Sequence, residues 1–244
     1  MKRTLNMLAV MLAFAVFAGC EPGNTAAGTA TPETGETVPV FGSDYIDTGI
    51  VLTDGSLSKV EDNSMEHPIA RIVLENGKEI ELELYPEKAP ETVANFIYLA
   101  NEKKLYDGLT FHRIIDEFMV QGGDPSGDGT GGPGYNIKGE FALNGFAQND
   151  ISHKTGVISM ARRSYPYDSA GSQFFICVAD CEFLDGQYAA FGKVIKGLEN
   201  VLELGKVPTY GGNSGTPKER QGISSIRVDT RGKQYGKPQS ATDD

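Results

Sequence analysis

The sequence of 244 residues predicts a mainly β fold, a closed antiparallel β-barrel accompanied by two α-helices. Many short runs of apolar or alternating residues follow residue 67, and glycine-rich turns separate them. Only two segments in this region have the apolar spacing of a helix. A barrel suits such short strands because closure pairs each strand on both of its sides.

The first two strands are expected to form a hairpin. Residues 69–75 and 79–85 flank Asn76-Gly77, a pair that favours a type I′ turn. In the second strand, isoleucine and leucine alternate with glutamate. One face of the hairpin should therefore face the core and the other should face water.

The first helix is expected to begin at Pro90, since proline fits the first turn of a helix. Its buried side would contain Val93, Ala94, Phe96, Ile97 and Ala100. Further strands are expected at residues 109–115, 118–121, 156–161, 172–178, 190–195 and 223–228, and a second helix at residues 198–204.

Residues 1–19 are typical of a secretory signal peptide. Lys2 and Arg3 precede an apolar run over residues 7–18, and small residues lead into Cys20. The run is too short for a good membrane-spanning helix, and an uncleaved membrane anchor is the alternative interpretation. We therefore expect the protein to be exported.

Cys20 directly follows Ala18-Gly19 and resembles the acylated cysteine of a bacterial lipoprotein, with palmitate among its lipids. Such an anchor would hold the chain on the extracytoplasmic side of a membrane. Residues 20–66 would form a flexible tether, of which 41–66 hold enough apolar residues to be partly ordered. We place the folded domain at 67–230 and a polar, frayed C-terminal tail at 231–244.

The charge of the chain argues against nucleic acid as a partner. The formal net charge is −11, and loss of residues 1–19 would remove Lys2 and Arg3 and leave −13. An acidic protein without a dense basic run repels phosphate backbones. The stretch 127–132 matches G-x-G-x-x-G formally, but it lacks the strand-to-helix setting of a dinucleotide site, so we expect a loop.

Histidines and cysteines indicate neither a metal site nor a cofactor. His67 and His153 are far apart in the sequence, and His112 should point away from the face of its neighbour Arg113. Cys177 continues an apolar strand and is expected to be a buried free thiol. A disulfide to Cys181 would require the chain to turn between the two residues.

The most informative stretch is FHRIIDEFMVQGGD, residues 111–124. It sets Arg113 among apolar and aromatic residues, with the amide of Gln121 nearby, and the apolar residues Phe111 and Ile115 flank Arg113 at strand spacing. A second segment, GSQFFIC at residues 171–177, repeats the mixture of amide and aromatic groups. Together the two segments predict an apolar peptide-binding pocket that contains one fixed cation.

These motifs also carry a family resemblance. FHRIIDEFMVQGGD, VISMAR at 157–162, GSQFFI at 171–176 and FLDGQYAAFGKV at 183–194 occur in the order and spacing of the cyclophilin-type peptidyl-prolyl isomerases. The resemblance extends from about residue 68 to about residue 229. It implies an eight-stranded barrel capped by two helices, with the peptide site on its outer wall.

The resemblance also assigns roles to residues. Arg113 matches the catalytic cation, Gln121 would orient it, and Gln173 would contact the substrate backbone. The remaining substrate-binding positions that it implies are Phe118, Met119, Ala161, Phe175, Phe183, Leu184 and Tyr188. No nucleophile, metal or cofactor is required.

Two positions depart from the pattern of the family. Arg162 follows Ala161 where many members have Asn, and Phe183 stands where cyclosporin-sensitive members carry Trp. The chain contains no Trp at all. We therefore predict weak cyclosporin binding, because the indole N–H donor is missing.

The function predicted from these observations is acceleration of X-Pro isomerisation in exported or unfolded proteins, by a monomer anchored to a membrane through its lipid. In this hypothesis Arg113 stabilises the twisted prolyl transition state. The alternatives are a non-catalytic proline-peptide binding module or holdase at the cell surface, and an accessory subunit whose barrel scaffolds a partner.

Overall fold

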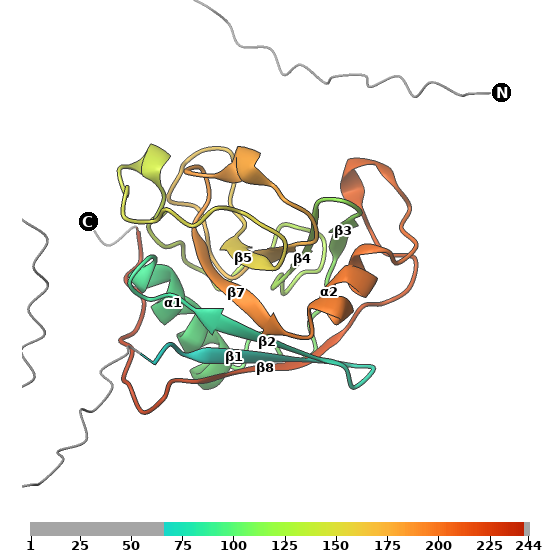
Figure 1. Ribbon diagram of the computed structural model, residues 1–244, viewed down its shortest axis with the longest axis horizontal. Coiled ribbons are helices and arrows are strands. Elements are labelled where there is room, and N and C mark those ends of the chain that lie inside the picture. Colours follow the sequence, from blue (N-terminus) through green and yellow to red (C-terminus); the bar gives the residue numbers. More distant parts are fainter. Residues whose placement is uncertain (1–65, 242–244) are drawn as a thin grey trace, which may run out of the picture. The chain divides into compact units, whose positions relative to one another are not determined.

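The computed structural model describes residues 66–241 (Figure 1). Its strands are β1 (Ile69–Leu74), β2 (Glu79–Leu84), β3 (Arg113–Ile115), β4 (Met119–Gly122), β5 (Val157–Met160), β6 (Phe174–Cys177), β7 (Ala190–Lys196) and β8 (Ile223–Asp229). They form one sheet in the order β3-β4-β6-β5-β7-β2-β1-β8, and every pairing is antiparallel. The predicted signal peptide, Cys20 and the tether up to residue 65 lie outside the described residues.

Two helices accompany the sheet. They are α1 (Pro90–Ile97), which continues into the π-helical turn η1 (Tyr98–Glu102), and α2 (Leu198–Gly205). Figure 1 shows the two helices at opposite ends of the curved sheet. Three short 3₁₀ turns complete the structure, η2 (Ala142–Asn144), η3 (Glu182–Leu184) and η4 (Gly212–Ser214). The mainly β prediction and both predicted helices are confirmed.

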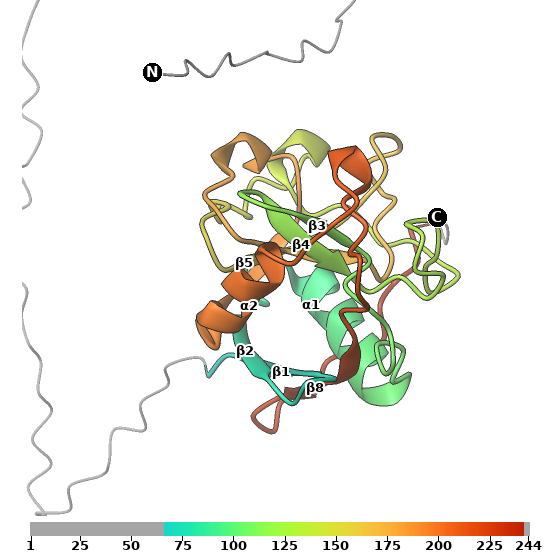
Figure 2. The same cartoon turned by 90° about the vertical axis from the view of Figure 1, so that its right-hand side faces the viewer.

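The predicted closure of the barrel is wrong, because the sheet is an open half-barrel whose edge strands, β3 and β8, do not pair. The segments beside them meet at an isolated bridge between Thr110 and Gly222, and a few backbone hydrogen bonds flank that bridge. β3 has three residues, and the N–H of Ile114 donates to the carbonyl of Gly215, 2.7 Å away in the loop before β8. That loop therefore occupies the position where a closing ladder would form (Figure 2).

The hairpin of β1 and β2 forms as predicted, with Ile72 opposite Ile80, but its turn is of another type. Gly77 has a positive φ of 81°, whereas Asn76 does not, and a type I′ turn needs positive φ at both central residues. The N–H of Gly77 donates to Leu74, and the N–H of Leu74 donates to Lys78. These bonds define a three-residue loop with glycine at the left-handed position, and they shift the predicted turn by one residue.

Side chains on the inner face of the half-barrel form the main core together with both helices. Val93, Phe96 and Ile97 of α1 and Ala100 of η1 are buried as predicted, whereas Ala94 is only half-buried. Asn95 is buried instead, because its amide donates to the carbonyl of Gly171 at 2.8 Å. Apolar spacing alone could not reveal this polar anchor between α1 and the segment before β6.

The outer face of β3, β4 and β6 carries a second, smaller cluster of apolar side chains. Alternate residues of a strand point to opposite faces, so Val120 and Ile176 join the main core while Met119 and Phe175 lie outside it. The cluster is centred on the buried residues Met119, Phe175, Cys177, Cys181 and Leu184. We call it the outer cluster.

The predicted strand 109–115 is shorter in the structure, where β3 begins only at Arg113. Phe111 is fully buried in the main core, so it does not share a face with Arg113 as its spacing had suggested. Ile115 does share that face and packs against the outer cluster. The alternation therefore starts at Arg113, since the backbone before it pairs with residues 221–223 instead of with β4.

A few contacts hold the largely exposed C-terminal segment up to residue 241 on the domain, where fraying was expected. The N–H of Ala241 donates to the carbonyl of Asn136 at 2.8 Å, and Lys233 donates to the carbonyl of Glu66 at 3.1 Å. Tyr235 packs against the main core. Its polar composition misled the prediction because one aromatic ring and a few backbone bonds are enough to dock the segment.

Candidate active site

Arg113 is the first residue of β3, where it is half-buried on the outer face of the sheet. Its Nη1 donates to Oε1 of Gln121, the residue opposite it on β4, at 3.2 Å. Partial burial lowers the pKa of the guanidinium from its usual value, and an arginine nevertheless remains protonated in a folded protein. The register of β3 and β4 thus holds a permanent cation in a fixed direction.

Gln121 is itself held by a relay of amides. Its Nε2 donates to Oε1 of Gln173 at 2.9 Å, and Nε2 of Gln173 donates to the carbonyls of Gly129 and Gly131 at 3.1 and 2.8 Å. The relay connects the glycine-rich loop to Arg113. Its two glutamines are 52 positions apart in the sequence. It fixes the orientation of Gln121 and so limits the rotamers of the arginine.

The outer cluster supplies an apolar surface beside this cation. Met119 and Phe175 come from β4 and β6, and Leu184 comes from η3. Phe118, Ala161 and Tyr188 are partly buried against them. Residues from four separate segments, all predicted for the pocket, therefore come together next to Arg113, whose Nη1 lies 3.9 Å from Sδ of Met119.

Phe183 lies at the outer rim of this surface. It is 65% exposed and contacts the ring of Phe118, with 5.7 Å between the ring centroids. An exposed aromatic ring beside a half-buried one is available to cover a bound ligand. Phe183 thus lies at the rim of the outer cluster and is not part of its buried floor.

Arg162 holds the other wall of the site in place, which sequence reasoning missed. Its guanidinium lies 4.5 Å from the ring centroid of Tyr188 and donates to the carbonyl of Gln187 at 2.8 Å. It also lies over the rings of Phe141 and Tyr167, at 4.9 and 5.1 Å. Tyr188 is therefore clamped between Arg162 on one side and the edge of Phe175 on the other.

His153 supports Phe175 from below and was also missed. The imidazole is fully buried and stacks on Phe175 at an interplanar angle of 17°. Its Nδ1 lies 2.9 Å from Asp185, and its Nε2 lies 3.1 Å from the hydroxyl of Ser159. Ser159 is buried as well, so these groups act as a polar support for the pocket. Nothing in the sequence spacing of the three residues indicated this contact.

The buried histidines predict that stability falls in mild acid. Burial is the main cause that lowers the pKa of both His112 and His153 below the usual 6.5. Below about pH 6.5 the unfolded chain therefore binds more protons than the folded chain. The stability that the neutral histidines provide above that pH is lost as the pH falls through their folded-state pKa values. Urea unfolding at about pH 7.5 and about pH 5.5 should give a lower free energy of unfolding at the lower pH.

A His153→Gln variant replaces the imidazole with an amide, which does not titrate, and serves as the control for this prediction. It should lose part of the pH dependence between these two values, since one of the two titrating groups is gone. An identical slope in the variant and in the unmodified chain would show that His153 does not contribute.

Cys177 and Cys181 are both free and buried, which confirms the free thiol predicted for Cys177. Burial raises the pKa of the Cys177 thiol well above its usual range. The chain turns after β6, so both sulfurs belong to the outer cluster behind Phe175. They contribute apolar packing to the back of the pocket.

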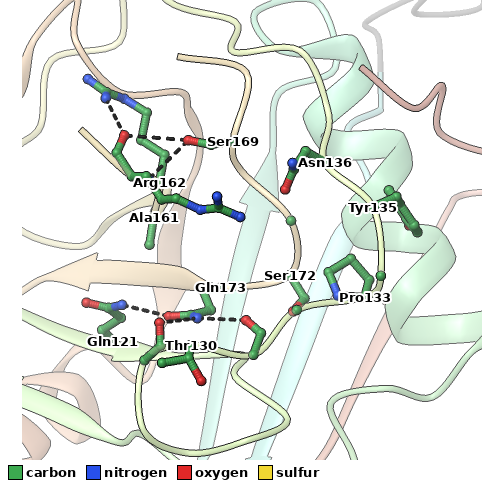
Figure 3. Close-up of a pocket in the computed structure, with 16 residues that line it drawn as sticks. Gln121, Thr130, Pro133, Tyr135, Asn136, Ala161, Arg162, Ser169, Ser172 and Gln173 are labelled. Atoms are coloured by element: carbon green, nitrogen blue, oxygen red, sulfur yellow. Dashed lines mark hydrogen bonds between the residues drawn. The ribbon is translucent and has the colours of Figure 1, made fainter. Parts of the chain in front are cut away.

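A cavity of about 420 Å³ lies beside the outer cluster and not over Arg113. The loop at residues 129–136 and the segments around Arg162 and Gly171 line it (Figure 3). Gln121, Ala161 and Gln173 line this cavity and also border the predicted pocket. The glycine stretch predicted to be a loop is indeed one, and it forms a wall of this cavity.

Within residues 66–241 no three His, Cys, Asp or Glu side chains gather in a way that could hold a metal ion. In the same part of the chain, no helix is long and apolar enough to cross a membrane. What the site does offer is one cation, a relay of amides and an apolar surface.

Fold and site together define a half-barrel protein with an apolar surface on its outer wall, beside one oriented arginine. The family model of the cyclophilin type peptidyl-prolyl cis-trans isomerase/CLD matches residues 70–228. The chain belongs to this family, and it is a peptidyl-prolyl cis-trans isomerase.

Relatives and solved structures agree with this assignment. Peptidyl-prolyl cis-trans isomerase B of Bacillus subtilis is 54% identical over 127 residues, which are 52% of this chain and 83% of the relative. An isomerase of Acinetobacter baylyi is 41% identical over 66% of this chain and 88% of its own length. A Cryptosporidium parvum cyclophilin crystallised in the presence of the dipeptide Ala-Pro has a TM-score of 0.58 and 31% identity, over 66% of this chain and 98% of its own.

Proposed function

We propose that the outer cluster holds the ring of a substrate proline while Arg113 stabilises the twisted form of the preceding peptide bond. Rotation about that bond costs about 18–20 kcal/mol because resonance must be broken. The two planar isomers differ by only about 0.5–1 kcal/mol at X-Pro, so the barrier is what limits exchange. A catalyst for this step needs to bind the twisted state better than either planar one.

The observation that carries this mechanism is the hydrogen bond between Nη1 of Arg113 and Gln121 at the edge of the outer cluster. In the twisted state the proline nitrogen loses conjugation and gains a lone pair that can accept a hydrogen bond. An arginine N–H held in advance by Gln121 can donate to it without reorganising. Lysine lacks the planar fork that permits one N–H to bond Gln121 while another faces the substrate.

The other residues would position the substrate. Phe175, Met119 and Leu184 would form the floor under the proline ring, with Phe118, Ala161 and Tyr188 as walls and Phe183 as a cover. Gln173 would border the peptide backbone, although its amide is already bonded to Gln121 and to the glycine loop. The cyclophilin crystallised with Ala-Pro supports a proline-containing peptide as the ligand class.

The test is the exchange between cis and trans signals of a short X-Pro peptide, measured by NMR with the full chain. We expect catalytic amounts of the chain to accelerate exchange. Peptide binding without faster exchange would favour a non-catalytic binding module and would contradict the mechanism above.

Cyclosporin provides a separate test of the role of Phe183. The ring of phenylalanine has no N–H donor, so we expect weak binding of cyclosporin to this chain. A Phe183→Trp variant should bind cyclosporin about 3- to 10-fold more tightly, the effect of one hydrogen bond. Since the chain has no other Trp, the fluorescence of the new indole reports binding directly. Nanomolar affinity of the unmodified chain would contradict the prediction.

We also propose that the chain is an exported lipoprotein, anchored to a membrane through acylated Cys20 and acting on unfolded exported proteins as a monomer. The charged and apolar pattern of residues 1–19 supports this proposal. Metabolic labelling with palmitate should mark the chain, and a Cys20→Ser variant should remain unlabelled. Equal labelling of the two, or recovery of the unmodified chain in the cytoplasm, would refute it.

A further inference from the structure

The cavity beside the prolyl pocket has the opposite charge to the chain as a whole. The chain has a formal net charge of −11, yet the lining of the cavity includes Arg162 and Arg163 and no carboxylate. The remaining ionisable group in the lining is Tyr135, whose pKa burial raises to about 12, so it stays neutral. The lining residues therefore carry a positive formal charge, which favours an anionic group inside the cavity.

The two arginines are not equivalent. The guanidinium of Arg162 is occupied, since it donates to the carbonyls of Arg163 and Gln187 and lies over the ring of Tyr188. The side chain of Arg163 is exposed and has no hydrogen bond or ion pair to any residue of the described chain. Its backbone N–H donates a hydrogen bond to the hydroxyl of Ser169 at 3.1 Å. Arg163 is thus a cation that lines a cavity and has no hydrogen-bond or ion-pair partner for its side chain within residues 66–241.

Carboxylates in the surrounding loops do not form ion pairs with Arg163. Asp124 accepts from the N–H groups of Ser126 and Gly129, and it is 1% exposed. Asp128 accepts from Thr130, and Asp168 accepts from the N–H of Gly139 at 2.7 Å. Each acid thus has donors of its own in or near its loop, and none of them forms an ion pair with Arg163.

The cavity is continuous with the place where the substrate would lie. Gln121, Ala161 and Gln173 belong both to its lining and to the border of the prolyl pocket. An extended peptide advances about 3.3 Å per residue, so a side chain a few residues from the proline reaches this cavity. A substrate bound at Arg113 would therefore place one of its neighbouring side chains beside Arg163.

We propose that this cavity selects substrates with an acidic side chain, aspartate or glutamate, a few residues from the proline, and that Arg163 is the cation that binds the carboxylate. The proposal rests on the proposed function, because it needs the proline to sit in the outer cluster. An acidic substrate would otherwise be disfavoured by the negative net charge of the chain.

The experiment uses the full chain and short peptides, blocked at both ends, that contain one X-Pro bond. Glutamate or glutamine is placed in turn at each of the three positions before and the two positions after the proline. kcat/KM is measured by NMR exchange at low ionic strength. We expect a preference for glutamate of about two- to five-fold at one position only, and a smaller preference in salt.

Variants then assign the preference to Arg163. In Arg163→Gln the glutamate-to-glutamine ratio should fall to about one, in Arg163→Glu it should fall below one, and Arg163→Lys should retain part of it. Lys138→Gln is the matched control, since Lys138 is exposed, follows the lining residue Asn136 by two positions and does not itself line the cavity. An unblocked glutamine peptide shows whether a terminal carboxylate serves equally well.

Two results would overturn the proposal. One is an equal ratio in the unmodified chain and in Arg163→Gln, and the other is an equal loss in Lys138→Gln, which would indicate a general effect of charge. If no peptide exchanges faster, the proposed function has failed instead. The ratio of binding affinities from chemical-shift titration then still tests Arg163 separately from catalysis.

Discussion

Replacing Arg113 with alanine should lower kcat/KM for an X-Pro peptide by about 10²–10³, the effect of removing one preorganised donor. The loss should appear mainly in kcat, because the donor is used in the twisted state and not in the planar ones. The outer cluster remains in the variant, so the peptide should still bind. NMR exchange for the rate and chemical-shift titration for affinity separate the two effects.

Arg113→Lys is the matched control for this prediction. It keeps the positive charge but lacks the fork that bonds Gln121 and the substrate together, so it should recover only a small part of the rate. Full activity in the lysine variant would mean that charge alone suffices. Full activity in the alanine variant would remove Arg113 from the mechanism altogether.

Replacing Phe96 with alanine should have the largest effect on stability, a loss of about 3–5 kcal/mol in the free energy of unfolding. Phe96 is fully buried at the centre of an aromatic group, 5.2 Å from Tyr106, 5.7 Å from Phe174 and 5.3 Å from Phe191 between ring centroids. Its removal leaves a cavity between α1 and the sheet that rigid neighbours cannot fill. Urea unfolding, with the midpoint converted to a free energy, measures the loss.

Phe183→Ala is the matched control for Phe96→Ala, since the same atoms are removed from a ring that is 65% exposed. The free energy of unfolding should change by less than about 1 kcal/mol in that variant. Equal losses in the two variants would contradict the assignment of Phe96 to the core. Because domains are typically stable by about 5–15 kcal/mol, the Phe96 variant should be close to unfolding in mild denaturant.

The strands and helices were predictable wherever local pattern decides structure. The hairpin over β1 and β2, the start of α1 at Pro90 and the extent of α2 follow from alternation, from proline and from helical spacing. Less predictable was β3, because its first residues pair with the segment before β8 and not with β4. A pairing between residues more than a hundred positions apart leaves no signal in a short window.

Some residues of the candidate site were predictable from the sequence and others were not. Arg113, Gln121 and Phe175 stood out in the sequence because a cation and an amide among aromatic residues are unusual in a strand. His153 and Arg162 did not, since each acts through a partner from another segment, Phe175 and Tyr188. A buried imidazole and a surface arginine are ordinary residues until the fold shows what they support.

By itself the sequence determined the family, the mainly β class and the residues that meet at the outer face, since these depend on motifs and on the two-residue period of strands. Only the tertiary structure decided that the barrel stays open, that Tyr188 is clamped by Arg162, and that Arg163, unpaired among the described residues, lines a cavity beside the prolyl pocket. The physical reason is that edges, stacked rings and cavities arise from groups distant in the chain, whose separation no local pattern encodes.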